Sequence, residues 1–187
     1  MNKIAQKVLF SLLLAFTANC WALLTPAQLI TLKAAITANA TWNAFPNNSD
    51  GAFNLAVLLN TPTASFIVWR TRVPIGEVGR AFNGTELAGL TTGNQSRLQT
   101  LAVYLDTGVN PSLADNRAFF DDVFSGAGGT LTRANLLTVW KRTALEIERI
   151  FATGTGTTAA PATMSTTPGG YTEGRISPDD VQAARNS

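Results

Sequence analysis

The sequence predicts a mainly α protein, a compact helical bundle with an extended Gly/Thr/Ala/Pro-rich C-terminal arm. Apolar residues recur at helical spacing through most of residues 23–152, which is typical of helices that share a core. Residues 153–165 read TGTGTTAAPATMS and hold too few large apolar side chains to form a core of their own. We therefore expect a helical domain over residues 23–152 and an arm over residues 153–187 that ends in a short helix.

Residues 1–22 resemble a secretory signal peptide. They combine a basic start, an apolar run over residues 8–16 and small residues up to Ala22, after which cleavage is expected. The apolar run is too short to span a bilayer, so we expect no permanent membrane span. The alternative is that translation begins near Leu23 and that the leader-like residues are an extension that is never made.

The composition excludes several kinds of catalytic site. The chain has no His, and its single Cys, Cys20, lies in the leader-like segment. A Ser-His-Asp triad, a Cys-His pair and an imidazole metal site are not available, so we expect no enzymatic activity, cofactor or metal. Without Lys3 and Lys7 the 14 basic residues become 12, equal to the 12 acidic ones. A neutral chain without a basic patch is not expected to bind nucleic acid.

The first helix of the domain is marked by its start signals. Thr25 can cap the helix, Pro26 takes the first helical position, and Gln28 is placed to complete a capping box. The helix is expected to end between residues 38 and 42, and its apolar stripe consists of Leu29, Leu32 and Ile36.

The next segment predicts a short helix and one extended run. Residues 47–50 form a helix start signal, and Thr61-Pro62 closes the helix that follows. Residues 66–73 are dense in β-branched and aromatic side chains and stop at Pro74. This run is expected to be either a strand, whose partner the sequence does not identify, or an extended connector.

Helices are predicted through the middle of the domain. Glycines divide residues 75–93 into short helical pieces. A helix over residues 95–107, which Gly108 is placed to terminate, turns inward Leu98, Leu101, Ala102 and Leu105. The helix that opens at residues 110–112 has an apolar face made of Phe119, Phe120, Val123 and Phe124.

The last long helix of the domain is expected to open at Thr130 or Thr132 and to run to Phe151. One face of this amphipathic helix, which covers residues 133–151, carries Leu136, Trp140, Ala144, Ile147 and Phe151. At the end of the arm, Ser177 is placed to cap a small helix over residues 178–184.

The acidic and glycine-rich motifs are interpreted as structural. Neighbours on a helix point about 100° apart, so Asp121 and Asp122 are expected on a solvated face and not in one metal site. The glycine-rich runs 126–129 and 154–157 lack the Gly-Lys-Ser/Thr ending of phosphate loops. Two further acids are expected to pair with arginines: Glu146 and Glu148 with Arg142 and Arg149.

Two segments are candidate contact sites for a partner. Trp69, Arg70 and Arg72 combine an aromatic ring with guanidinium groups, a mixture favoured at interface centres. The alternative for this segment is core packing of Trp69 with surface arginines. The second candidate precedes the terminal helix, where the alternative is a frayed chain end, and consists of Tyr171, Arg175 and Ile176.

Several segments together resemble a set of small, uncharacterised tailed-bacteriophage and prophage proteins. The resemblance covers nearly all of the chain from Leu24 onward and lies in LTPAQLITLKAAI (24–36), NSDGAFNLAVLLN (48–60), VWRTRVP (68–74), ERIFATGTGTTAAPATM (148–164) and ISPDDVQAARN (176–186). It implies a structural role in virion morphogenesis and offers no active site to transfer. Residues 1–23 depart from the pattern of these proteins.

From the resemblance and the arm we expect a non-enzymatic structural component of a tailed-phage particle. The expected position is a head-tail connector, neck or tail-joining subunit, in a homo-oligomeric ring that contacts portal, neck or tail subunits through the C-terminal arm. The expected location is the virion. The alternative, suggested by the leader-like segment, is an exported periplasmic or secreted helical binding module.

Overall fold

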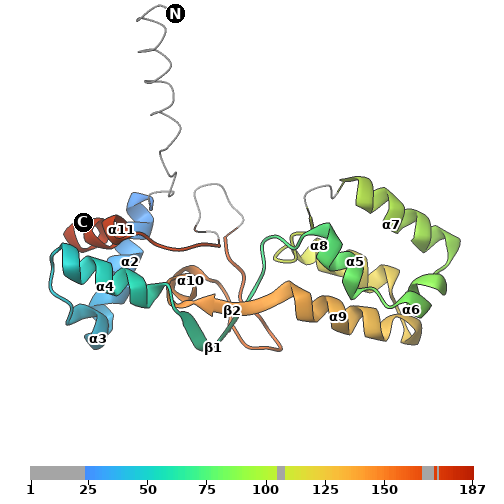
Figure 1. The fold of residues 1–187 in the computed structure, drawn as a ribbon, viewed down its shortest axis with the longest axis horizontal. Coiled ribbons are helices and arrows are strands. Elements are labelled where there is room, and N and C mark those ends of the chain that lie inside the picture. Colours follow the sequence, from blue (N-terminus) through green and yellow to red (C-terminus); the bar gives the residue numbers. More distant parts are fainter. Residues whose placement is uncertain (1–23, 105–107, 166–170, 172) are drawn as a thin grey trace, which may run out of the picture.

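The structure, a computed structural model, describes residues 24–104, 108–165, 171 and 173–187. Within these residues the chain is mainly helical and contains one two-stranded antiparallel sheet, which confirms the predicted class. The molecule is elongated, with helices at both ends and the strands between them (Figure 1). The signal-peptide prediction for residues 1–22 lies outside the described residues.

The first lobe consists of three helices near the start of the chain and two from its end. The N-terminal helices are α2 (Pro26–Ala38), α3 (Ala40–Asn43) and α4 (Ser49–Leu59). The capping box predicted at α2 is present, because the Thr25 N–H donates to Gln28 Oε1 at 2.7 Å and the Gln28 N–H donates to Thr25 Oγ1 at 3.4 Å. Asn48 caps α4, so both predicted helix starts are confirmed.

Two strands connect the lobes. They are β1 (Pro62–Trp69) and β2 (Lys141–Leu145), which pair antiparallel with Ile67 opposite Thr143. The β-like run predicted over residues 66–73 is therefore a strand over its first part, and its partner is a segment that was predicted to be helical.

The prediction of one continuous helix over residues 133–151 is wrong. The segment forms the end of α9 (Thr130–Trp140), then β2, then α10 (Glu146–Phe151). The chain leaves the helical path after Trp140 because its backbone then pairs with β1, and the Arg70 N–H donates to the Trp140 carbonyl at 2.8 Å.

The second lobe contains α5 (Ile75–Ala81), α6 (Gly84–Ala88), α7 (Thr92–Tyr104), α8 (Ala114–Val123) and α9. A side chain from α6 caps α9, because the Glu86 carboxylate accepts the N–H groups of Leu131 and Thr132 at 2.9 and 2.7 Å. The helix expected over residues 95–107 is present as α7, which begins earlier, at Thr92, and is described as far as Tyr104; its predicted inward residue Leu105 lies outside the described residues.

The apolar side chains do not form the single bundle core that the sequence predicts. The first core lies between the helices of the first lobe and includes Leu24, Leu32, Ile36, Leu55, Leu59, Ile147, Ile176 and Val181. The second core lies in the other lobe and includes Trp69, Val78, Val109, Phe120, Phe124, Leu136 and Trp140. A smaller central cluster beside the strands consists of Val68, Ala144, Ala162 and Met164. The elongated shape follows from this separation.

Residues 153–165 run along β1 on the side away from β2. The Ile67 N–H donates to the Gly156 carbonyl at 2.7 Å, and the Trp69 N–H donates to the Ala162 carbonyl at 3.0 Å. Gly156 has a φ of 67°, and the Phe66 ring occupies the space where a Cβ would lie. The small side chains predicted to make a loose arm therefore allow close packing against the ribbon.

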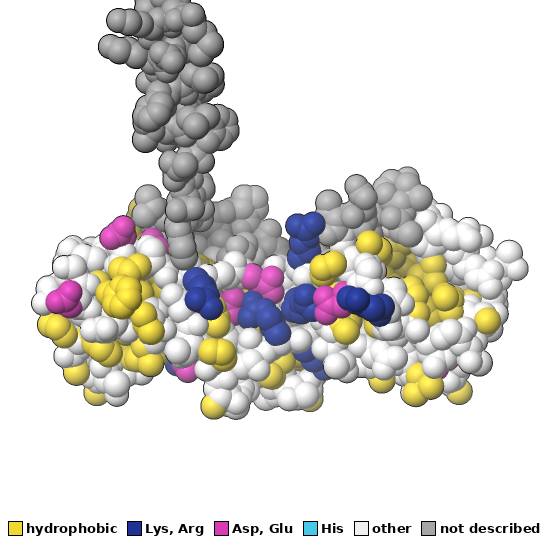
Figure 2. Space-filling model, viewed as in Figure 1, with side chains coloured by type: hydrophobic (Ala, Val, Ile, Leu, Met, Phe, Trp, Pro, Cys, Tyr) yellow, Lys and Arg dark blue, Asp and Glu magenta, His cyan; other side chains and the backbone are white. Residues whose placement is uncertain are grey.

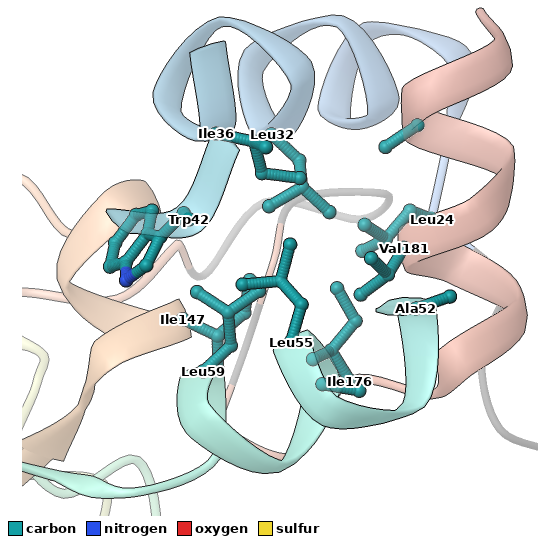
Figure 3. Packing of buried hydrophobic residues seen from close by; sticks show 12 residues of the cluster. Leu24, Leu32, Ile36, Trp42, Ala52, Leu55, Leu59, Ile147, Ile176 and Val181 are labelled. Carbon is teal, nitrogen blue, oxygen red and sulfur yellow. The ribbon is translucent and has the colours of Figure 1, made fainter. Parts of the chain in front are cut away.

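The prediction that residues 153–187 form an arm outside the fold is wrong for the described part of that segment. The terminal helix, α11 (Pro178–Asn186), is longer than predicted and packs against α2 and α4. Its apolar face enters the first core, where Leu24, Ala52 and Val181 lie close together (Figure 3). The Leu24 N–H also donates to Asp180 Oδ1 at 3.1 Å, so the helix contributes both apolar and polar contacts.

Two neighbouring alanines of α11 test this packing with the same substitution. Ala184 is fully buried, whereas Ala183 is exposed. We expect Ala184→Asp to lower the free energy of unfolding by more than about 3 kcal/mol, because it places an unpaired carboxylate in the first core. Ala183→Asp is expected to cost less than about 1 kcal/mol. Urea denaturation followed by circular dichroism measures both, and equal costs would contradict the docking of α11.

Candidate interaction surfaces

The buried carboxylate of Glu148 is the centre of an ion-pair network between the lobes. Glu148 lies on α10 and is only 1% exposed. Arg142, on the neighbouring strand, donates from Nη1 to Oε2 and from Nη2 to Oε1, each at 2.7 Å. The N–H groups of Leu145 and Gly174 donate to the same carboxylate at 2.8 and 3.1 Å. Four donors thus surround two oxygens, which is a structural arrangement with no oxygen left to act on a substrate.

Glu173 extends this network to Thr71, two residues after the end of β1. Its carboxylate accepts Arg142 Nε at 3.1 Å and the Thr71 hydroxyl at 2.6 Å. Burial lowers the pKa of Arg142, but its bonds to Glu148 and its attraction to both acids outweigh that effect and raise the pKa above the usual value. Arg142 is therefore a permanent cation with two carboxylate partners.

The predicted pairing of the α10 acids with nearby arginines is confirmed in outline. Arg142 pairs with Glu148, and Arg149 pairs with Glu146 at 2.9 Å. No local signal indicated the part played by Glu173, because its partner Arg142 lies 31 residues earlier in the chain. A contact of that separation depends on tertiary folding and follows no helical or strand spacing.

Trp69, the first of the predicted contact residues, is packed inside the protein. It is 8% exposed and belongs to the second core. The Arg117 guanidinium lies 4.4 Å from the centre of its ring, and Lys141 Nζ lies 5.3 Å from the centre. The alternative of core packing, left open by the sequence, describes Trp69 in this structure, and two cations cover its ring.

Arg70 and Arg72 differ in their surroundings. Arg70 donates from Nη1 to Glu77 at 2.6 Å and to the Val139 carbonyl at 2.9 Å, so it joins β1 to α5 and α9. This hydrogen-bonded pair, despite some burial, lowers the pKa of Glu77. Arg72 is exposed. The three predicted residues therefore do not form one surface patch.

The second predicted group also separates into buried and exposed members. Ile176 is buried in the first core, and its N–H and carbonyl bond to the Asn60 side chain, each at 2.9 Å. The Tyr171 ring stacks on Phe151 with centroids 4.6 Å apart, and its hydroxyl donates to the Gly174 carbonyl. Only Arg175 is exposed.

Large apolar side chains are exposed on both lobes, and the sequence analysis did not single them out. On the first lobe Phe53 and Val57 lie one helical turn apart on α4 and are 57% and 53% exposed. The members on the second lobe are Ile75, Leu87, Leu113, Leu131 and Leu137. Figure 2 shows apolar side chains exposed over both ends of the molecule and charged side chains gathered between them. These surfaces are the best candidates for contact with a partner.

A groove of about 360 Å³ lies over the ribbon, between the end of α9 and the segment after α10, and is lined from both β1 and β2. Ile67 and Leu137 provide apolar lining. The remaining lining is polar or cationic and consists of Thr138, Lys141, Arg142, Thr143 and Thr158.

The acids predicted to be solvated are exposed, as expected. Asp121 and Asp122 both face solvent, and Asp122 pairs with Arg97 at 2.7 Å. Among the described residues no group of three acidic or thiol side chains is placed to hold a metal ion. No helix in the described part of the chain is long and apolar enough to cross a membrane.

Comparison with known proteins gives no relative from which a site could be transferred. No protein-family model, no curated protein and no solved structure matches the chain.

The role of Glu148 can be tested against its exposed neighbour. We expect Glu148→Gln to lower the free energy of unfolding by about 3 kcal/mol, because Arg142 loses its main counter-charge and an amide N–H₂ faces donors. Glu146→Gln removes a more exposed pair on the same helix and is expected to cost at most about 1 kcal/mol. Chemical denaturation at neutral pH measures both values. Similar costs for the two variants would show that the network does not hold the ribbon together.

The raised pKa of Tyr171 predicts that the protein loses stability at high pH. Burial, with smaller contributions from Glu148 and Asp180, raises the pKa of Tyr171 above its usual value of 10.0. A raised pKa stabilises the folded state below the unfolded value, and this contribution is lost as the pH rises above about 10. We expect wild type to lose stability relative to Tyr171→Phe between pH 9 and 11, because Phe keeps the stack on Phe151. Parallel stability curves for both proteins would contradict the burial of the phenol.

Proposed function

We propose that this chain is a non-enzymatic structural component of a tailed-phage particle, a head-tail connector, neck or tail-joining subunit. The observation that supports it most is the placement of large exposed apolar side chains on both lobes of an elongated molecule. A subunit of a ring contacts one neighbour on each side through two different surfaces, which an elongated body can present at its two ends.

The exposed apolar surfaces of the two lobes are different, so we propose that the first lobe of one subunit contacts the second lobe of the next subunit. The first lobe offers the pair Phe53 and Val57 on α4, and the second offers Leu131 on α9, which is 57% exposed. Contact between unlike surfaces is heterologous and generates a ring when the rotation closes. Portal, neck or tail subunits would then cover the faces that the ring leaves open.

The resemblance to small tailed-bacteriophage and prophage proteins supports the same proposal. The resembling segments coincide with α2, α4, the end of β1, α10 and α11, which build the first lobe and the ribbon. The proposed contact through the C-terminal segment involves fewer residues than the sequence suggested. Ile176 and α11 pack within their own chain, so the exposed Arg175 is the part of that site we propose for contact with a neighbour.

Mass spectrometry of purified particles and of the periplasmic fraction tests the proposed function. We expect the protein in particles, with an N-terminus near Leu23, and no periplasmic pool. Recovery only in the periplasm, as a product cut after Ala22, would overturn the proposal. That result would support an exported helical binding module, the alternative that the leader-like residues 1–22 favour.

Two exposed residues of α4 allow assembly to be separated from folding. Because Phe53 and Val57 are more than half exposed, Phe53→Ser with Val57→Ser is expected to change the free energy of unfolding by less than about 1 kcal/mol. If α4 meets a neighbour, the double variant should enter particles at least about tenfold less than wild type. Asn54→Ser, an exposed position on the same helix, should enter normally. Normal incorporation of the double variant would exclude α4 from the assembly surface.

A further inference from the structure

Asp180 is a buried carboxylate without a cationic partner among the described residues. It lies in the first turn of α11 and is 3% exposed. Its Oδ2 accepts the N–H and the hydroxyl of Ser177 at 3.2 and 2.7 Å, which belong to the capping box of the helix. None of the ion pairs within the described part of the chain includes it. Asp180 therefore has hydrogen bonds but no counter-charge, which makes its burial costly.

The start of α11 compensates only part of this charge. A helix N-terminus carries roughly half a positive charge, and two acids, Asp179 and Asp180, share it here. Burial, Glu148 and Asp180 together raise the pKa of Tyr171, so the negative charge of Asp180 still acts on its surroundings. Glu148, the other buried acid of the described residues, has the guanidinium group of Arg142 as its partner. A full positive charge is missing beside Asp180.

The second oxygen of Asp180 faces the beginning of the helical domain. Oδ1 accepts the Leu24 N–H at 3.1 Å, in a buried bond between residues 156 positions apart. A carboxylate oxygen can accept two hydrogen bonds, and Leu24 supplies the one that Oδ1 receives from the described residues. Leu24 is itself packed in the first core, beside Val181 of α11 (Figure 3). The missing charge and the spare acceptor position thus lie at the same place.

A chain that begins at Leu23 carries its α-amino group one peptide unit from the Leu24 nitrogen. Successive backbone nitrogens are within about 4 Å of each other in every conformation, so this group lies within roughly 7 Å of Asp180 Oδ1. The α-amino group has an ordinary pKa of about 8 and is mostly protonated at neutral pH. Two successive backbone nitrogens form a recurrent binding site for one anion. The new chain end therefore has the charge and the reach that Asp180 requires.

We propose that Asp180 binds the α-ammonium group of a chain that begins at Leu23, and that this ion pair holds α11 against the start of α2. While residues 1–22 are attached, residue 23 has an uncharged peptide N–H and the pair does not form. Loss of these residues therefore strengthens the first lobe where its two ends of chain meet. The ion pair is independent of the proposed function, because the virion role and the exported role both place the N-terminus near Leu23.

Chemical denaturation of the chain over residues 23–187, which retains every described residue, provides the test. Each protein is compared with a free and with an N-acetylated α-amino group. We expect acetylation to raise the unfolding equilibrium constant of wild type at least about tenfold, because it removes the charge next to Asp180. In Asp180→Asn the same acetylation should have less than about a twofold effect. Equal effects of acetylation in the two proteins would overturn the proposal.

The neighbouring acid provides a matched control. Asp179 lies in the same turn of α11 but is exposed. Acetylation should destabilise Asp179→Asn as much as wild type, because the partner of the α-ammonium group is unchanged. The full chain from Met1 should unfold like the acetylated form, since neither has a charge at position 23. A full chain as stable as the free-amino form would contradict the ion pair.

Reactivity of the α-amino group gives a result that does not depend on any variant folding. A paired ammonium holds its proton more firmly, and only the free amine reacts with an acylating reagent. At pH 7 we expect the α-amino group of the wild-type chain from Leu23 to react at least about tenfold more slowly than that of the peptide Leu-Leu-Thr-Pro-Ala, which has the same first five residues. Mass spectrometry measures both rates, and equal rates would overturn the proposal.

Discussion

The carboxylate of Glu148 is the constraint on which the rest of the structure depends. A carboxylate that is 1% exposed is costly to bury unless its charge and lone pairs are satisfied. Here Arg142 supplies the charge, and the N–H groups of Leu145 and Gly174 complete the set of donors. A strand, the start of a helix and a segment near the chain end are thereby fixed at one point. The chain must leave the path of α9 after Trp140 for this to occur.

The elongated architecture follows from what this network joins. Each lobe buries its own apolar cluster, and the ribbon between them has only a small cluster of its own, so polar contacts carry much of the connection. Arg70 reaches both Glu77 and the backbone of α9, and Glu173 ties the C-terminal segment to Thr71. Figure 2 shows the same separation, with charged side chains gathered in the middle of the molecule and apolar side chains exposed at its ends. The middle sets the geometry, and large apolar side chains of both ends stay exposed.

Elements with local signals were predictable, and elements defined by distant partners were not. The helix starts at Thr25 and Ser177 were predictable because a capping box closes within four residues. The strand β2 was missed because Leu136, Trp140, Ala144 and Ile147 recur at helical spacing, and all four are indeed buried, although they belong to three elements. Burial at every third or fourth position is compatible with a helix that becomes a strand and then a helix again. Among the predicted contact residues, only position and residue type could be read, so exposed Arg72 and buried Trp69 looked alike.

The sequence by itself determined the mainly helical class, the helix starts, the extended run at β1 and the pairing of the α10 acids with nearby arginines, because each depends on neighbours within a few positions. Only the tertiary structure decided that residues 153–165 follow β1, that α11 closes the first core, and that the apolar residues divide between two lobes. Small Gly, Thr and Ala side chains are compatible with a free arm and with close packing, and the distinction lies in whether a distant part of the chain offers N–H groups to the backbone carbonyls of this segment. Ile67, Trp69 and Asn60 offer such groups here, and no spacing within residues 153–187 records that they do.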